Sequence, residues 1–272
     1  MQGRGWFCAW PALAATLVLG LLVPSLLPAQ EPGPCTAGLV EKRGTLVPVA
    51  FLPAQATPAV VVEWLGHSSF VLTAPSGLRI LTDPPAWHPV PVTPDLVTVS
   101  NLHLTHTAVA RVPGTPRVLW GLTPEQGWNP VALRLQDVAL FNVPSYASRT
   151  ALEESPIQNS IFVFHLGDLC LVHLGNLRHP LTPQQLRRIG KPDVVMLPVD
   201  GQWTLSLGDA LTVVVQLQPL LVLPMHIDTA DAAEAFVAFT AGRYPVRRLS
   251  GRTLVLSRAS LPAATELVVF GD

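Results

Sequence analysis

The sequence is poor in charge, in cysteine and in aromatic residues. Only 13% of its 272 residues are charged, and the formal net charge is -1. Chains that stay disordered or coat nucleic acid carry many charges of one sign, so the composition excludes both classes. Hydrophobic residues make up 49% of the chain, which is enough for a large folded core. Nucleic acid is therefore not expected as a partner.

Several catalytic motifs are also absent. The chain has no Gly-x-Ser-x-Gly turn, no phosphate-binding glycine loop and no dinucleotide fingerprint. It has three cysteines, Cys8, Cys35 and Cys170, and no Cys-x-x-Cys pair, so zinc-finger and thioredoxin chemistry are not indicated. Cys35 and Cys170 could pair in an exported protein. A cysteine in an apolar strand such as Cys170 is also typical of a small buried thiol, and the sequence leaves both readings open.

Residues 1–29 are typical of a secretory signal peptide. Arg4 precedes an uncharged stretch, Pro11–Leu27, and the small residue Ala29 follows it. We expect cleavage after Ala29 and export to the periplasm or the exterior, with no transmembrane segment left in the mature chain. The alternative is an uncleaved segment that tethers the protein to a membrane. The stretch is only marginally long enough to span a bilayer, and its prolines make it a poor helix.

The rest of the chain predicts an α/β domain behind a tether. Residues 30–57 are rich in Pro, Ala and Gly and are expected to be a tether, and residues 58–272 form the domain. Strands come first and then alternate with helices, which is typical of layered α/β folds. We predict strands at 60–65, 69–73, 79–82, 96–100, 118–120, 138–143, 161–165, 169–173, 194–197, 221–223 and 253–257, and helices at 183–189, 207–217 and 231–240.

Histidines and other polar residues follow three of the predicted strands. His103 and His106 come after strand 96–100, and His226 comes after strand 221–223. His173 is the last residue of a third predicted strand, 169–173, and begins another polar segment. The carboxyl ends of strands are where α/β folds build their sites. Several imidazoles at such an edge are suited to zinc.

In order and sequence, these motifs resemble the metallo-β-lactamase superfamily, most closely its ascorbate-6-phosphate lactonase-like branch. The resemblance covers about Val60 to His226. It is carried by Trp64–Phe70, Leu81–Pro84, His173–Thr182, Leu197–Gly201 and Pro224–His226. The resemblance implies an αββα sandwich, the metallo-β-lactamase fold, which agrees with the α/β pattern of strands and helices.

Most metal ligands of the family are replaced in this chain. The family signature His-x-His-x-Asp-His reads Asn101-Leu102-His103-Leu104-Thr105-His106 here. The resemblance also places a histidine where Ala147 stands and a metal-bridging aspartate where Asn176 stands. The ligand positions that keep histidine are His103, His106 and His226, and those that lost their ligand are Asn101, Thr105, Ala147 and Asn176.

These replacements predict that no dinuclear site forms. Two dications about 3.5–4 Å apart repel each other strongly when no carboxylate lies between them, and Thr105 and Asn176 carry no charge. His106 and His226 remain on one side of the site. If His103 turned toward them, three imidazoles and a water could hold one zinc. At most one zinc ion, and no other cofactor, is therefore expected.

Two functions remain open from the sequence. The first is an exported protein of this fold that is catalytically impaired or only binds a small-molecule ligand, its histidines kept as hydrogen-bonded core residues. The alternative is a metal-dependent hydrolase of lactones or phosphoesters with a rebuilt mononuclear site.

Four further residues are candidates for the pocket. His67 and His179 lie at family motif positions and are expected to support the pocket rather than bind metal. Asp83 ends the third strand. Asp200 stands where the branch usually has Gly, and its carboxylate could serve as an acid, a base or a turn residue.

Overall fold

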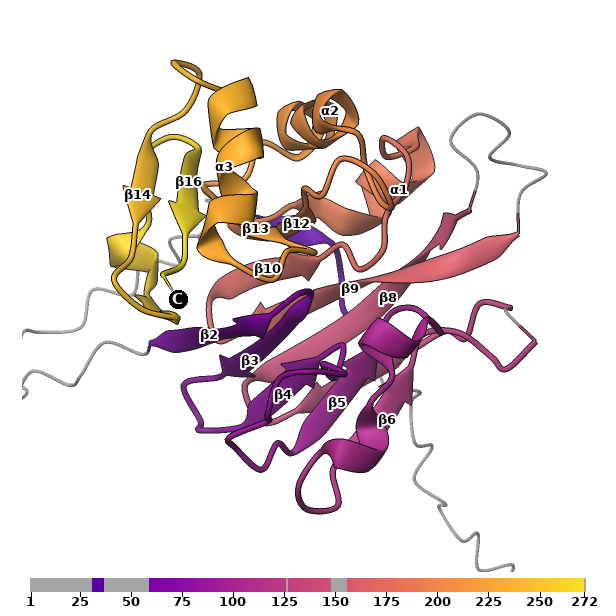
Figure 1. Ribbon diagram of the computed structural model, residues 1–272. Helices are drawn as coiled ribbons and strands as arrows, with labels where there is room; N and C mark the ends of the chain where they lie inside the picture. Colours follow the sequence, from indigo (N-terminus) through magenta and orange to yellow (C-terminus); the bar gives the residue numbers. More distant parts are fainter. Residues whose placement is uncertain (1–30, 37–58, 126, 148–155, 272) are drawn as a thin grey trace, which may run out of the picture. The chain divides into compact units, whose positions relative to one another are not determined.

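Two β-sheets face each other across one apolar core (Figure 1). The computed structural model describes residues 31–36, 59–125, 127–147 and 156–271. One sheet has six strands in the order β15-β2-β3-β4-β5-β6. Their bounds are β15 Thr253–Leu256, β2 Val60–Gly66, β3 Ser69–Thr73, β4 Arg79–Thr82, β5 Leu96–Val99 and β6 Arg117–Trp120.

The other sheet has eight strands in the order β14-β16-β13-β12-β10-β9-β8-β7. Its central strands β10, β12 and β13 are parallel to one another. The bounds are β14 Val246–Arg248, β16 Glu266–Val269, β13 Leu221–Met225, β12 Val194–Pro198, β10 Leu169–His173, β9 Ile157–Leu166, β8 Val138–Tyr146 and β7 Ala132–Leu135.

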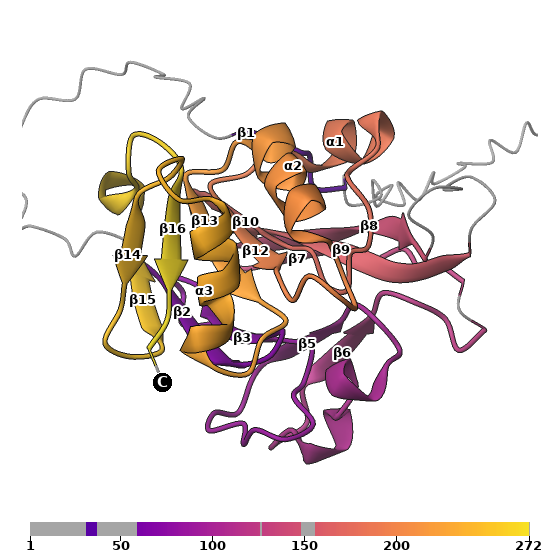
Figure 2. The same cartoon turned by 45° about the horizontal axis from the view of Figure 1, so that its top comes forward.

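Three α-helices cover the outer face of the eight-stranded sheet, as both views show (Figures 1 and 2). They are α1 Pro183–Ile189, α2 Leu207–Leu217 and α3 Ala230–Phe239. Helix α1 begins at a capping box, in which the Thr182 hydroxyl accepts from the Gln185 amide, and Gly190 follows its end. The predicted layered α/β sandwich is confirmed.

The outer face of the six-stranded sheet is covered differently. Alternate strand residues face opposite ways, so Leu72 packs into the main core while Val71 packs into a second cluster on the outer face. That cluster is closed by Val90, Val92 and other residues between 84 and 112. Five prolines lie between residues 84 and 94, and proline interrupts helices. In the described residues this cover holds the short 3₁₀ helices Leu104–His106 (η1) and Val109–Arg111 (η2) and no α-helix.

A disulfide ties a segment before the domain to the eight-stranded sheet. Cys35 is bonded to Cys170 of β10. Strand β1 (Cys35–Thr36) also pairs with β11 (Gly190–Lys191). The pairing that the sequence left open is therefore present. The predicted signal peptide lies outside the described residues, and so does the predicted tether except for residues 31–36.

The described residues contain no helix that is long and apolar enough to cross a membrane. The strands of these residues position the polar loops. Strands β2, β4, β5, β12 and β13 are each followed by one of the polar segments that build the site described below.

Removing the disulfide should lower the stability of the fold. The bond closes a separation of 135 residues, and a cross-link restricts the unfolded chain. We expect Cys35→Ser to lower the free energy of unfolding by about 2–4 kcal/mol, measured by urea denaturation. The wild-type protein should lose a similar amount on adding reductant, whereas Cys35→Ser should not respond. Equal stability of the oxidised wild type and the variant would contradict this.

Candidate metal centre

His67 lies directly after β2 and is held by its backbone. Its carbonyl oxygen accepts hydrogen bonds from the Trp64 indole at 3.3 Å and from the His226 amide at 3.0 Å. An isolated β-bridge joins His67 to Ile227. The loops that follow β2 and β13 are thus connected to each other, and this connection brings His67 and His226 together.

His106 ends the 3₁₀ helix η1 and is fully buried. Its Nδ1 lies 2.7 Å from Oδ2 of Asp83, which follows β4. The Ser100 hydroxyl donates to the same oxygen, and the Ser100 amide donates to the other. Burial alone would raise the pKa of Asp83, but the His106 imidazole and the Ser100 hydroxyl more than offset it, so the pKa is lowered. The carboxylate therefore stays charged and fixes the His106 ring.

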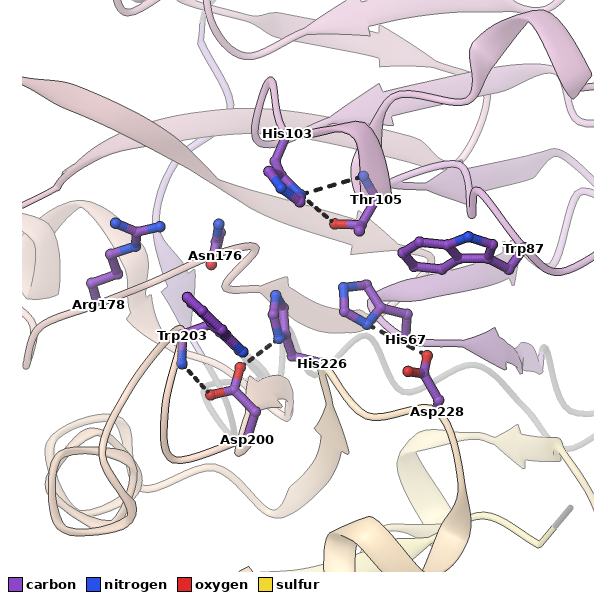
Figure 3. Close-up of a pocket in the computed structure, with 10 residues that line it drawn as sticks. All are labelled: His67, Trp87, His103, Thr105, Asn176, Arg178, Asp200, Trp203, His226 and Asp228. Carbon is purple, nitrogen blue, oxygen red and sulfur yellow. Dashed lines mark hydrogen bonds and ion pairs between the residues drawn. The ribbon is translucent and has the colours of Figure 1, made fainter.

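His226 follows β13, and its Nδ1 lies 2.5 Å from Oδ2 of Asp200 (Figure 3). Asp200 follows β12 and accepts from the amides of Gln202, Trp203 and Thr204. Burial opposes ionisation of Asp200, yet the bonds to His226 and to the loop amides lower its pKa well below the usual range. Asp200 therefore acts as a charged support for His226 and as the centre of a turn.

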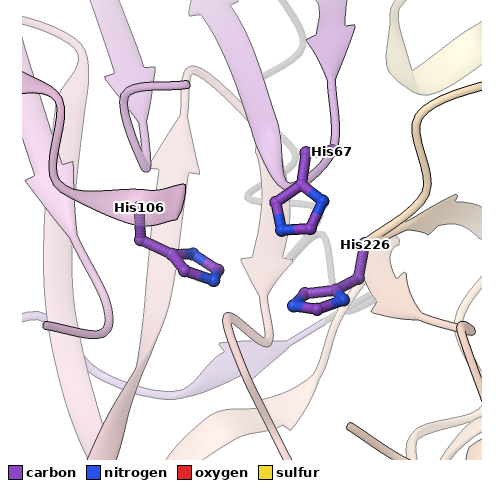
Figure 4. Close-up of side chains that lie close together, drawn as sticks. All are labelled: His67, His106 and His226. Carbon is purple, nitrogen blue, oxygen red and sulfur yellow. The ribbon is translucent and has the colours of Figure 1, made fainter. Parts of the chain in front are cut away.

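The rings of His67, His106 and His226 converge (Figure 4). One nitrogen of each lies within 4.8 Å of the corresponding nitrogens of the others. Nδ1 of His106 and of His226 is occupied by a carboxylate, so Nε2 is the atom each can offer. Nε2 of His106 and both ring nitrogens of His67 are buried without a hydrogen-bond partner. Buried nitrogens without a partner are groups to which an ion or a water can bind.

His67 is kept neutral by its surroundings. Burial, and then the neighbouring rings of His226 and His106, lower its pKa from 6.5 to about 3. Its Nδ1 lies 3.6 Å from a carboxylate oxygen of Asp228, which is largely exposed. A neutral imidazole is the form that binds a metal ion. The donor set therefore fits a single zinc-like ion.

The backbone at the site is strained. His67 has φ 50°, Asp83 has φ 42° and His226 has φ 62°. This left-handed region is uncommon for residues other than glycine, and residues held there tend to gather at functional sites. The described chain has only two other such residues that are not glycine, Gln136 and Gln218. The strain is therefore concentrated where the imidazoles meet.

A cavity of about 400 Å³ opens beside the histidines (Figure 3). Trp87 and Trp203 are its large apolar residues, with 64% and 72% of their surfaces exposed. The lining consists of His67, Trp87, His103, Thr105, Asn176, Arg178, Asp200, Trp203, His226 and Asp228. A cavity of this size accommodates a small molecule.

A family model of the beta-lactamase superfamily domain matches residues 61–226. The chain belongs to this superfamily. A UPF0173 metal-dependent hydrolase of Methanoculleus marisnigri is 27% identical in an alignment of 198 residues that covers 63% of this chain and 82% of the relative. A similar relative from Caldivirga maquilingensis is 27% identical in an alignment of 195 residues that covers 62% of this chain and 82% of the relative. The lactonase-like branch is not singled out by these relatives and stays a prediction.

Solved structures show the same fold. A protein of Thermotoga maritima, assigned to the Zn-dependent hydrolases of the metallo-β-lactamase superfamily, has a TM-score of 0.59 and 29% identity, covering 77% of this chain and 97% of its own. An isothiocyanate hydrolase from Delia radicum gut bacteria has a TM-score of 0.52 at 16% identity, covering 71% of this chain and 98% of its own. The second likeness concerns the fold alone.

The other positions that the resemblance assigns to metal ligands have contacts of their own. Nδ1 of His103 faces the Thr105 hydroxyl at 3.0 Å, and His103 does not join the group of three. The Asn101 side chain bonds to Gln158 and His103 backbone atoms, so it braces the loop. The Ala147 amide donates to the Pro156 carbonyl. The sequence predicts that His103 joins His106 and His226. In the structure the third histidine of this group is His67 instead.

Asn176 and His179 have different surroundings. Asn176 is buried, lines the cavity, and its Oδ1 has no hydrogen-bond partner. His179 uses both ring nitrogens, because Nε2 accepts from the Tyr146 amide and Nδ1 lies 2.7 Å from the Pro180 carbonyl. It therefore links β8 to the loop before α1.

Sequence reasoning did not single out four cavity residues. Trp87, Arg178, Trp203 and Asp228 lie in loops. Trp203 and Asp228 closely follow Asp200 and His226 along the chain, and this proximity was the one available signal. Trp87 lies in the proline-rich cover, where nothing in the sequence marks it.

The metal-free protein should lose stability as the pH falls below 6.5. His67 binds a proton in the unfolded chain near pH 6.5 but in the folded chain only near pH 3, so acid favours unfolding in this window. One pH unit below 6.5 the effect of this residue is about 1 kcal/mol. Asparagine tolerates the left-handed backbone. In urea denaturation, His67→Asn should therefore lose less free energy of unfolding between pH 7 and 5.5 than the wild type. Identical losses in the two proteins would contradict the lowered pKa.

Proposed function

We propose that the protein is a metal-dependent hydrolase with a single metal ion on His67, His106 and His226. The observation that carries the proposal is the convergence of three nitrogens to within 4.8 Å of one another. In a tetrahedral site, Zn–N bonds of about 2.0–2.1 Å place two nitrogens about 3.4 Å apart. The three nitrogens, which lie within 4.8 Å of one another, would move closer together by up to about 1.4 Å to hold one ion.

The surroundings of the three rings support the same proposal. Histidines that bind metal almost always donate their other ring N–H to a carboxylate, a carbonyl or a water. Asp83 and Asp200 occupy this position for His106 and His226. Asp228 lies near Nδ1 of His67 at a longer distance. The carboxylates hold the proton on Nδ1, and this leaves the Nε2 lone pair directed into the site.

Bound zinc supplies Lewis acidity, which polarises a carbonyl or phosphoryl oxygen and makes water acidic. The protein's own part is to orient. Asp83 and Asp200 fix two of the rings, Trp87 and Trp203 present apolar surface to the substrate, and Thr105 offers a hydroxyl in the cavity. Hydrolysis of an ester bond, in a lactone or a phosphoester, is the reaction that such a site favours.

A dinuclear reaction is not part of the proposal. Asn101 and Ala147 offer no imidazole, and Thr105 and Asn176 offer no carboxylate. The protein is accordingly impaired as a two-metal enzyme. If it binds no metal at all, the second candidate is a non-catalytic protein that binds a small molecule, which the cavity of about 400 Å³ favours.

We also propose that the protein is exported. The signal-like residues 1–29 support this. So does the disulfide between Cys35 and Cys170, because such bonds persist mainly in oxidising compartments. Sequencing the N-terminus of the protein from its own host should find a chain that starts at Gln30. A chain that retains residues 1–29 would favour the tethered alternative.

Metal analysis of the purified protein tests the proposed site. We expect one zinc ion per chain, and His67→Asn and His106→Ala should each lose it, because two imidazoles alone bind weakly. His103→Ala is the matched control, since His103 lines the same cavity without joining the three rings. It should keep the full metal content. Two metal ions per chain, or loss in His103→Ala but not in His67→Asn, would overturn the proposal.

The carboxylate behind His226 should tune metal affinity. Asp200→Asn removes the charge that faces Nδ1 of His226 at 2.5 Å. Loss of such a partner usually weakens metal binding about 10–100-fold, which zinc competition titration measures. Asp228→Asn should have a smaller effect, because its carboxylate lies 3.6 Å from His67 and is 63% exposed. Equal and negligible effects of both variants would argue against this support.

A further inference from the structure

A second cavity shares part of its lining with the first one. Its volume is about 280 Å³. Its lining residues are Asn101, Leu102, His103, Leu122, Gln158, Asn176 and Arg178. Three of them, His103, Asn176 and Arg178, also line the cavity beside the histidines. These three side chains therefore stand where the two cavities meet, next to the proposed metal site.

Arg178 is a cation in the lining of both cavities. It is half-buried, and among the residues that the structure describes no carboxylate lies within ion-pair distance of its guanidinium and no hydrogen bond engages it. Arginine is always charged in proteins. An unpaired guanidinium in a cavity wall is suited to bind a carboxylate or phosphate through two parallel hydrogen bonds.

The charges around Arg178 favour an anion there. Among the lining residues of the second cavity that the structure describes, none is an aspartate or a glutamate. The two carboxylates of the first cavity are directed elsewhere: Asp200 contacts His226, and Asp228 lies near His67 and His88. An anion next to Arg178 would therefore meet no carboxylate from the described lining of the second cavity.

Asn176 supplies a second polar group at the same place. Its side chain is buried, and its Oδ1 has no hydrogen-bond partner. Its backbone amide is fixed by Oδ1 of Asn159 at 2.7 Å. The side-chain amide can donate hydrogen bonds as well as accept them. Figure 3 shows Asn176 between Arg178 and His226. A polar side chain on a hydrogen-bonded backbone thus lies between Arg178 and His226.

We propose that Arg178, together with Asn176, binds a carboxylate or phosphate group of the substrate. This inference rests on the proposed hydrolase function and adds to it a substrate class, small anionic esters. The reacting bond lies at the three histidines and the negative charge at Arg178. The exposed rings of Trp87 and Trp203 contact the apolar part of the molecule at the mouth of the cavity.

Anion binding to the metal-free protein tests this subsite, because no metal is then present to bind the anion. The probes are inorganic phosphate and acetate, which separate the two oxyanion sources, titrated by calorimetry after the metal has been removed and the chelator dialysed away. The wild-type protein should bind at least one of the two anions saturably. Arg178→Gln should weaken that binding at least about tenfold.

Two further variants serve as controls for the charge and for the hydrogen bonds of Arg178. Arg187→Gln removes the same charge from the exposed surface of α1 and should bind the anion like wild type. Arg178→Lys keeps the charge but not the two parallel hydrogen bonds, and its affinity should lie between those of wild type and Arg178→Gln. Thermal unfolding verifies that each variant is folded.

The subsite and the hydrolase proposal can fail separately. Arg178→Gln should keep one metal ion per chain, because Arg178 is not among the three converging residues. Metal binding with no anion binding, or with equal anion binding in wild type and Arg178→Gln, overturns the subsite alone. Anion binding that depends on Arg178 in a protein that takes up no metal supports the subsite and overturns the hydrolase.

Discussion

The buried carboxylate of Asp83 is the interaction on which the site depends. It is 1% exposed, and its two oxygens receive the Ser100 amide, the Ser100 hydroxyl and the ring of His106. A buried charge is tolerated only when it is paired and hydrogen-bonded, so these groups are held as a unit. The unit joins the ends of β4 and β5 and sets the direction of the His106 ring, to which the other two imidazoles converge.

Most of the central strands could be predicted from the sequence, because they are short β-branched runs between turn residues. The predicted strand 138–143 ends before a proline, whereas β8 continues to Tyr146. The predicted strand 161–165 lacks the first four residues of β9, 157–160, three of which are polar. Asn159 of β9 is buried because its amide bonds to Ser145 and Leu174, a long-range role that no local pattern reveals. The missed strands of the eight-stranded sheet, β7, β14 and β16, are short and lie at or next to its edges, and the missed strands β1 and β11 have two residues each.

The site was predictable only in part. Superfamily motifs indicated His106 and His226, two of the three histidines whose rings converge. The place of His67 depends on a backbone bridge to residues far along the chain and on a left-handed φ, and neither is encoded in motif spacing. His103 does belong to the linear motif, but its ring contacts Thr105, two residues along the chain, and does not join the other imidazoles. A linear motif specifies residue types, whereas ring direction is set by contacts between loops.

The three left-handed residues at the site also bear on how stability and function are divided within this fold. Each such residue costs on the order of 1–3 kcal/mol and persists because the surroundings hold it. The packing of the two sheets and their core therefore offsets the free-energy cost of the strained loops. Exchanging these residues for glycine would relieve the backbone and remove the imidazoles or the carboxylate at the same time. The most stable version of this chain would be one without its site.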